Sequence, residues 1–585
     1  MEASGKPLEL PSAVSNPVSD IGRERVSQQQ IVLRLLIGIT GILVVAPLLI
    51  LLRSSILPPG ELPFDSISIT FRNFAGAYSD PATLRLFLNT LVYAGGSVFF
   101  GLVGAGVLAW LVERTDLPFR TTIKVLMFAN MTIPPLAYAF GWVLLLNPNN
   151  GALNVLLKSI FGIDHPFDVY TLSMMIFVSA TELVPTMFVM LSGVFRNMDP
   201  QLEKAGAVCG AGYLATARYI VLPLLTPGLL SVGMYMLMIM VQAFEIPLVM
   251  GLTANVPVLS VYIYLLSSPE GGTPKYGLAA AFGIGLLVLA MVLMAIYYAA
   301  TRTAERFRVV TGKAFRPKRI ALGTLRYPAA IFTSIYFVVM LGPLLALLWS
   351  SLLPFYQLPS AAALNRISLG NYRTIVNTTK VRQAILNTMI VVFSTATLAM
   401  VLSGMLSWFA VRVRGRLARY LDMIAFAPMA IPRIVMAIAI LLLYIRTPLY
   451  GTVWIIVLAQ VTAYLAFGTR TVNAALMQIH PELENAAMIS GATWLTTMRK
   501  ILLPILWPHF LNAWLWIVAH SMRDLTLALT LMSPDNIVLS STLWVLWSFG
   551  DVARASALLI LMVLGLLAVV LPIQLYAARK TEIKS

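Results

Sequence analysis

The chain has 585 residues, of which 59% are hydrophobic and 11% are charged, and its formal net charge is +17. A soluble globular protein is roughly half apolar and about a quarter charged, so this composition excludes a water-soluble domain and indicates a protein of the lipid bilayer. A positive charge of this size is compatible with nucleic-acid binding. The basic residues, however, concentrate between apolar blocks, as the positive-inside rule predicts for cytoplasmic loops, and we expect no nucleic-acid partner.

Long apolar runs recur along the chain, and each can cross a bilayer as a helix. Backbone polar groups must be bonded internally in lipid, so we predict an all-α, polytopic membrane fold. A β-barrel would show short alternating segments, whereas these runs are continuous. About twelve transmembrane helices are expected, at 33–53, 85–112, 123–146, 171–195, 226–246 and 277–301 in the first half and at 328–350, 384–411, 421–445, 451–473, 509–531 and 556–578 in the second.

These runs form two blocks of six. We predict a cytoplasmic N-terminal tail at 1–32, a first six-helix repeat at 33–301, a basic cytoplasmic linker at 302–327, a second repeat at 328–578 and a cytoplasmic C-terminal tail at 579–585. The tail before residue 30 lacks the basic start, apolar core and cleavage site of a signal peptide. The basic linker and loops place both termini in the cytoplasm under the charge rule.

The two blocks are repeats of each other. Because each contains an even number of spans, they enter the membrane in the same direction, as parallel repeats around a central pathway. An offset of 298 residues pairs Asn89-Thr90 with Asn387-Thr388 and Pro134 with Pro432, and a later offset of 281 pairs Pro200 with Pro481 and Pro223 with Pro504. The difference falls in the loop after the third helix, which is much longer in the first half.

A polar stretch interrupts the apolar pattern once in each half, before the fifth helix. Both copies fit Glu-x-Ala-[Ala/Gly]-x3-Gly-x9-Ile-x-Leu-Pro. A proline suits the first helical turn, the small residues permit close approach, and the glycine permits a chain reversal. We predict a short helix-turn-helix on the cytoplasmic surface, although an interfacial helix that only packs against the bundle would share this pattern. The positions that carry the pattern are Glu203, Ala205, Gly206, Gly210, Glu484, Ala486, Ala487 and Gly491.

Both stretches resemble the EAA motif of ABC-importer permeases, and residues 35–578 resemble the fused, two-repeat permeases of the ferric-iron type. The resemblance implies the type I permease fold, a bacterial inner membrane location and coupling loops that dock on two copies of an ABC ATPase subunit. It also implies a periplasmic or extracellular solute-binding protein. Ferric iron is the implied cargo, with thiamine, polyamine, phosphonate or sulfate as alternatives. Asp524-Leu525-Thr526 stands where the family often has Glu-Leu-Pro.

The sequence contains no phosphate-cradling loop of the form Gly-x4-Gly-Lys-Ser/Thr. The nearest segment, "VTGKAF" at 310–315, lacks the first glycine and the hydroxyl residue. We therefore expect a permease and not an enzyme, with ATP on partner subunits, no catalytic residue and no cofactor on this chain. The single cysteine, Cys209, excludes an internal disulfide, and four scattered histidines have no metal-ligand spacing.

Ionisable groups inside a membrane are costly and are functional candidates by default. Glu182, Glu245 and Asp524 are the candidates for a translocation path or gate, and carboxylates suit a cation such as ferric iron. The alternative is that helix packing or solvent satisfies them. An ion-coupled secondary transporter is the rival class. It would need broken mid-membrane helices and coupling carboxylates, and Glu182 is the residue that favours it. A membrane enzyme would need a His, Asp or Cys cluster, which the sequence lacks.

Overall fold

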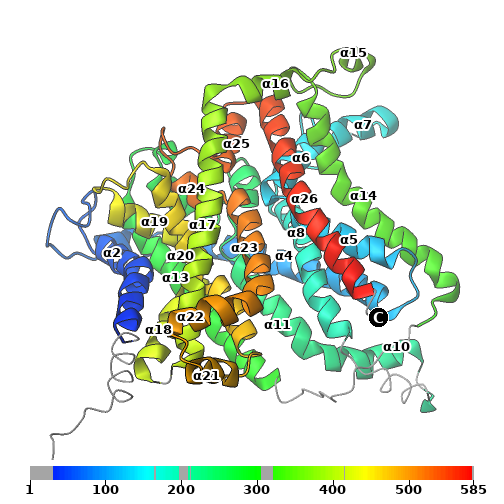
Figure 1. The fold of residues 1–585 in the computed structure, drawn as a ribbon. Helices are drawn as coiled ribbons and strands as arrows, with labels where there is room; N and C mark the ends of the chain where they lie inside the picture. Colours follow the sequence, from blue (N-terminus) through cyan, green and yellow to red (C-terminus); the bar gives the residue numbers. More distant parts are fainter. Residues whose placement is uncertain are drawn as a thin grey trace, which may run out of the picture.

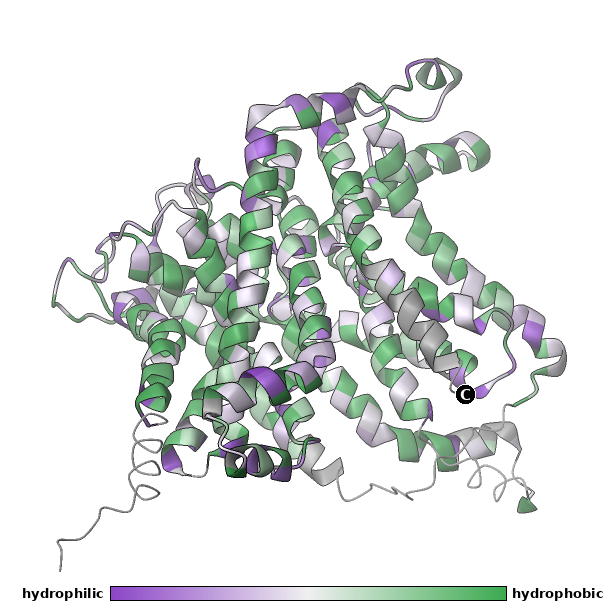
Figure 2. Ribbon diagram, viewed as in Figure 1, coloured by the Kyte–Doolittle hydropathy of each residue, from purple (hydrophilic) through white to green (hydrophobic). Residues whose placement is uncertain are grey.

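The computed structural model describes residues 30–163, 166–196, 208–210, 212–304, 320–413 and 415–582, and these residues form a helical bundle (Figure 1). Within those ranges, ten helices are long and apolar enough to cross a membrane, or up to twelve if each of two bent pairs counts as one span. Apolar residues dominate the long helices (Figure 2). The all-α, polytopic fold is therefore as predicted.

The first half begins with a span at Gln30–Ser55 that contains the π-helical turn η1 and α2. Its elements are η1 (Gly41–Val45), α2 (Ala46–Ser55), α3 (Arg72–Tyr78), α4 (Pro81–Arg114), α5 (Arg120–Met131), α6 (Pro135–Leu146), α7 (Ala152–Phe161), α8 (Leu172–Arg196), α10 (Tyr213–Thr216), η2 (Ala217–Val221), α11 (Leu222–Met240), η3 (Pro247–Gly251), α12 (Leu259–Ser267), η4 (Pro269–Gly271) and α13 (Tyr276–Ala304).

The second half follows the same order. Its elements are η6 (Gly323–Leu325), α14 (Arg326–Ser351), α15 (Ala361–Leu364), α16 (Gly370–Asn377), α17 (Thr379–Arg412), α18 (Arg416–Phe426), η7 (Ala427–Ala430), α19 (Arg433–Tyr444), α20 (Val453–Leu476), α21 (Glu482–Ile489), α22 (Trp494–Thr497), η8 (Met498–Leu502), α23 (Leu503–Arg523), α24 (Thr526–Thr530), α25 (Leu539–Ser548) and α26 (Val552–Glu582).

The third span of each half differs from the single helix that was predicted. It is a pair of helices bent by 94° between α5 and α6, and by 110° between α18 with η7 and α19. Pro134 and Pro432 stand at the two bends in extended backbone conformations. A proline also disfavours the helical region for the residue before it, and Ile431 is extended accordingly. The repeated proline thus breaks both helices at equivalent points.

The fifth spans also differ from the prediction. They begin earlier than expected, at Arg218 and Leu495, and end earlier, at Met240 and Arg523. Asp524 leaves the helical region and its side chain caps the next turn by accepting from Leu527 N at 3.0 Å. Asp is a strong helix-capping residue because its carboxylate satisfies a free N–H. The residues that follow each break form the short helical turns η3 and α24 instead of extending the span.

The internal repeat extends to single hydrogen bonds. Thr90 Oγ1 accepts from Leu259 N at 2.9 Å at the start of α12, and Thr388 Oγ1 accepts from Leu539 N at 2.8 Å at the start of α25. All four residues are buried. The Asn-Thr pair shared by the two halves therefore fixes the entry of the same short helix in both.

The first helix of each half crosses to the other half. α2 packs against α19, and α14 packs against α6. In Figure 1, α2 lies beside α18, α19 and α20, and α14 lies on the opposite flank beside α5. The α6–α14 contact is close, since a Cβ on Gly141 would lie 2.4 Å from the Pro343 carbonyl oxygen. Small residues permit such approach in membrane bundles, and the buried apolar cluster accordingly runs through both halves.

Candidate functional site

The second polar stretch folds as predicted into two short helices with a reversal between them. α21 and α22 are joined at Gly491, which has a φ of +83°. Ala492 N donates to Ala487 O at 3.0 Å and closes the end of α21. Gly210 has an equivalent φ of +80°. The remaining predicted positions of the first stretch, Glu203, Ala205 and Gly206, lie outside the described residues.

Glu484 points into the bundle, where it binds the end of α17. Its Oε1 accepts from Arg412 Nε at 2.7 Å, and its Oε2 accepts from Trp408 Nε1 at 3.1 Å. Arg412 also donates from Nη2 to Ile479 O at 2.8 Å, just before α21. Glu484 is only 8% exposed. This network joins α21 rigidly to a 34-residue membrane helix.

Sequence reasoning missed these roles of Trp408 and Arg412. The signal was present, because both residues recur at the 298-residue offset as Trp110 and Arg114. Arg114 is 1% exposed at the equivalent end of α4. A buried arginine at a helix end requires a polar environment, which could have suggested a link to the neighbouring polar stretch.

The opposite side of the second stretch is uncovered. Leu483, Ile489 and Leu495 are 47%, 88% and 67% exposed, and basic Arg499 and Lys500 are exposed beside them. Figure 1 places α21 and α22 together at one end of the bundle. Exposed apolar residues bordered by charge are typical of a surface that contacts a protein or a membrane.

Each polar stretch continues into the fifth span through a π-helical turn. η2 leads into α11 and η8 leads into α23. Such turns in α-helices are frequent at functional sites. The connection is therefore helical from the polar stretch to the interior of the bundle, where α11 and α23 end.

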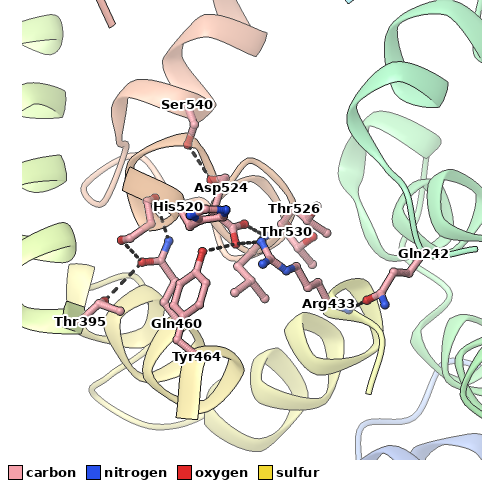
Figure 3. Close-up of polar contacts among 12 residues, drawn as sticks. Gln242, Thr395, Arg433, Gln460, Tyr464, His520, Asp524, Thr526, Thr530 and Ser540 are labelled. Atoms are coloured by element: carbon pink, nitrogen blue, oxygen red, sulfur yellow. Dashed lines mark hydrogen bonds and ion pairs between the residues drawn. The ribbon is translucent and has the colours of Figure 1, made fainter. Parts of the chain in front are cut away.

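Asp524, at the end of α23, is the most enclosed of the candidate path residues (Figure 3). Its side chain is fully buried and accepts from Arg433 Nη1 at 2.6 Å. Tyr464 OH lies 3.4 Å from the same carboxylate oxygen, and the Arg433 guanidinium lies over the Tyr464 ring, 5.4 Å from its centre. Asp524 is thus satisfied by protein groups and not by solvent. The Arg433 side chain is 38% exposed.

Two hydrogen bonds near Asp524 join the first half to the second, and they occupy equivalent positions in the two repeats. Gln242, just after α11, accepts through Oε1 from Arg433 N at 3.2 Å (Figure 3). Arg523, which ends α23, donates from Nη1 to Met131 O at 2.9 Å. Gln242 and Arg523 are separated by the same 281-residue offset as the polar stretches. Each fifth span therefore contacts the bend of the opposite third span, and we call these two contacts the cross-bonds.

Glu182 and Glu245 are half-buried close to the cross-bonds. Glu182 on α8 lies within electrostatic range of Arg523 and Glu245, and Glu245 lies within range of Arg433 and Asp524. The structure therefore brings together all three predicted carboxylates, from both halves. Sequence reasoning did not single out Arg433, although a charge inside the predicted 421–445 helix was a signal.

The described residues contain no group of three or more His, Cys, Asp or Glu side chains that could hold a metal ion. His520, a residue of the same region, stacks on Trp516 with 3.6 Å between ring centres and bonds through Nδ1 to the Trp516 carbonyl. Cys209 is exposed. Within the described ranges, the three carboxylates therefore do not form a closed coordination site for a metal ion.

Comparisons with known proteins identify relatives that match most of the chain and others that match a little under half of it. The chain is 23% identical over 495 residues to the ferric transport system permease protein FbpB of Actinobacillus pleuropneumoniae, covering 83% of this chain and 70% of that protein. It is 28% identical over 260 residues to the putative 2-aminoethylphosphonate transport system permease protein PhnV of Salmonella typhimurium, covering 43% and 96%.

Among solved structures, a bacterial alginate ABC transporter bound to its periplasmic protein matches with 23% identity and a TM-score of 0.35, covering 41% of this chain and 85% of that one. The model of the family described as binding-protein-dependent transport system inner membrane component matches residues 81–306 and 400–581. These two matches span more than half of the chain and fall one in each repeat. The chain therefore belongs to that family, the multi-pass inner-membrane permeases of ABC importers.

Proposed function

We propose that the chain forms the translocation path of an importer for ferric iron and couples to two ATPase subunits through the Gly210 and Gly491 stretches. The observation that carries the coupling is the Arg412–Glu484–Trp408 network, which joins an uncovered docking surface to a membrane helix. ATP would be bound by the partner subunits. A solute-binding protein would deliver the cargo on the opposite face.

The cross-bonds suggest how the path closes. Gln242 and Arg523 tie each fifth span to the bend of the opposite third span, and the fifth spans continue from the coupling stretches. When ATP draws the two stretches together, the spans turn about their π-helical junctions and separate from the bends. The path then opens toward the binding protein, and hydrolysis restores the cross-bonds. This is alternating access, in which the fifth spans have two positions. ATP at the coupling stretches and the binding protein at the opposite face both shift the balance between these positions.

Ferric iron is supported by the relatives that cover most of this chain, named as ferric transport permeases. The half-buried carboxylates Glu182 and Glu245 are hard oxygen donors, which suit such a cation. Arg523 stands near Glu182 in the closed arrangement. When the path opens, Arg523 would move away, and Glu182 and Glu245 would be free to contact the passing ion.

A second cargo class has a specific observation in its favour. Arg433 and Arg523 are both half-buried near the cross-bonds, and guanidinium groups suit phosphonate oxygens. Part of the chain, 43% of its length, also matches a permease named for 2-aminoethylphosphonate. Polyamine has a comparable match, to a permease named for spermidine and putrescine, whereas thiamine and sulfate remain alternatives on family grounds alone.

We propose that the face with α21 and α22 is cytoplasmic and that both termini lie on it. Figure 1 supports this arrangement, since the first described residues and the end of α26 lie toward the side of α21 and α10. The predicted tails and most of the 302–327 linker lie outside the described residues.

The test is uptake by proteoliposomes that contain the chain, its ATPase subunits and its binding protein. Labelled ferric iron and labelled 2-aminoethylphosphonate would be compared, each with wild type, with Glu182→Gln/Glu245→Gln and with Arg433→Gln. ATP-dependent iron uptake that the double carboxylate variant abolishes supports the proposal. Phosphonate uptake without iron uptake overturns the cargo assignment, and absence of ATPase binding overturns the coupling assignment.

A further inference from the structure

The helix α7 presents its apolar side away from the bundle. It lies in the loop that is longer in the first half, and Leu156, Ile160 and Phe161 are 51%, 62% and 65% exposed. The side that faces the protein carries Asn154, which is 2% exposed, and Leu153, which packs against the buried apolar cluster. A surface helix in water normally buries its apolar stripe against the core. Because α7 exposes three further apolar residues on its outer side, we infer that this side meets an apolar medium.

Specific hydrogen bonds hold α7 in this orientation. Asn154 Nδ2 donates to Leu146 O at 3.1 Å and to Phe167 O at 2.7 Å, on either side of the helix in sequence. Phe167 N donates back to Asn154 Oδ1 at 3.3 Å. These contacts pin the start of α7 to the end of α6 and to the returning chain. The exposed apolar side is therefore a fixed feature of the loop.

The second half of the molecule supports the same loop. Tyr356 OH donates to Leu144 O at 2.8 Å and to Asn150 O at 3.0 Å, just before α7. Tyr356 follows α14 by five residues, so α7 begins near the depth at which this membrane helix ends. Tyr170 OH accepts from Asn147 Nδ2 at 3.2 Å in the same region. Tyrosines that combine an apolar ring with a bonded hydroxyl are typical of the membrane–water boundary.

Lipid-facing surface is present at the same level of the bundle as α7. Along α14, Leu341, Leu345 and Leu348 are 50%, 52% and 40% exposed at helical spacing, as expected for a span that contacts acyl chains. Figure 2 shows apolar residues on both α7 and α14, and Figure 1 draws α7 at the level of the upper part of α14. The exposed apolar side of α7 therefore lies at a level where a membrane helix also exposes apolar residues, and this favours lipid as the medium.

We propose that α7 is an interfacial anchor that lies in the bilayer surface opposite the coupling stretches, with Leu156, Ile160 and Phe161 inserted at the edge of the acyl chains. Lys158 and Ser159 lie on the other side of the helix, toward head groups and water. Because Asn154 binds the end of α6 and Tyr356 joins the loop to α14, the anchor fixes elements of both halves at one membrane depth. This inference is independent of the cargo.

Spin labels on single cysteines test the proposal in the full chain, reconstituted with its ATPase subunits. In a Cys209→Ser background, labels at Ile160→Cys and Ser159→Cys would be compared for collision with oxygen, which concentrates in lipid, and with a water-soluble nickel chelate. A label at Leu348→Cys serves as the lipid-facing control. We expect the Ile160 label to match the Leu348 label, with severalfold higher relative oxygen access than the Ser159 label.

Two results would overturn the inference. High access of the nickel chelate to both α7 labels would show that the helix lies in water. Shielding of the Ile160 label from both reagents, or shielding that appears only on adding the solute-binding protein, would show that a protein covers this side. All three labelled positions are substitutions at the surface, so loss of folding does not limit the comparison, and ATP hydrolysis by the assembled complex verifies that each variant is intact.

Discussion

Arg412 and Glu484 form an ion pair between the last residue of α17 and the first turn of α21, with Nε and Oε1 2.7 Å apart. Their side chains are 12% and 11% exposed. Removing one partner of a buried pair leaves the other charge uncompensated and costs about 3–5 kcal/mol. Arg412→Ala should therefore lower the free energy of unfolding by about 3 kcal/mol, measured by thermal unfolding in detergent.

The matched variant for this pair is Glu484→Gln, which keeps the Trp408 contact and removes the charge. It should cost less than Arg412→Ala. The exchange Arg412→Glu/Glu484→Arg should recover part of the loss and part of the coupling to ATP hydrolysis. If Arg412→Ala unfolds at the temperature of the wild type, the pair does not hold α21 to the membrane helix.

Substitution of Gly491 or Gly210 should destabilise the chain, and the backbone conformation of these glycines alone should be the cause. Both have φ near +80°, and a Cβ at either position would meet no atom within 4 Å. A left-handed conformation costs a non-glycine residue about 1–2 kcal/mol. Gly491→Ala should destabilise the chain by about 1 kcal/mol, and Gly491→Asn should cost less because Asn tolerates this region.

Gly212 provides the control for these glycines. It also has open space around its Cβ position, without the left-handed φ, so Gly212→Ala should leave unfolding unchanged. Thermal unfolding of the three alanine variants side by side measures the difference. Equal effects at positions 212 and 491 would contradict the conformational explanation.

The hydroxyls of Thr90 and Thr388 should contribute similar amounts to stability. Each accepts the first N–H of a short helix in a buried environment, and an unsatisfied buried donor costs about 1–3 kcal/mol. Thr90→Val and Thr388→Val should both destabilise the chain within this range, whereas Thr→Ser at either position should retain most of the stability. Chemical unfolding measures the free energy of unfolding of each variant. A large difference between the two valine variants would contradict the equivalence of the two repeats.

The cross-bonds should hold the path closed. A hydrogen bond contributes about 1 kcal/mol, which corresponds to roughly a fivefold change in a two-state equilibrium. Gln242→Ala and Arg523→Gln should each raise basal ATP hydrolysis of the reconstituted complex and reduce its dependence on the binding protein. Together they should act more strongly than either one. Basal hydrolysis equal to that of the wild type in all three variants would show that these contacts are not part of the gate.

Much of the fold follows from hydropathy and charge. A chain in a bilayer needs apolar segments long enough to cross it and must satisfy its backbone polar groups internally, and few folds meet both requirements. The bends at Pro134 and Pro432 were not predicted, although both prolines were recognised as repeated positions. A proline in a membrane helix is tolerated in many settings, and its effect depends on the neighbouring helices. The end of the fifth span in the second half was missed for a similar reason, because the partners of Asp524, Arg433 and Tyr464, come from distant parts of the chain.

The candidate site was predicted in part. The carboxylates Glu182, Glu245 and Asp524 were identified because charge in an apolar run is conspicuous. Gln242 escaped notice because an amide carries no charge, and its contact with Arg433 spans 191 residues. Broken membrane helices, expected of an ion-coupled secondary transporter, are present here as well. They do not distinguish that class from an ABC permease, and the family assignment decides between the two.

The most direct test of the coupling account is stimulation of ATP hydrolysis by the loaded binding protein in proteoliposomes. Wild type, Gly212→Asp and the double variant Gly210→Asp/Gly491→Asp would be compared, with folding verified by size-exclusion chromatography. The account predicts stimulation in wild type and in Gly212→Asp, and none in the double variant. Normal stimulation and transport by the double variant would contradict it and leave the two polar stretches as packing elements at the membrane surface.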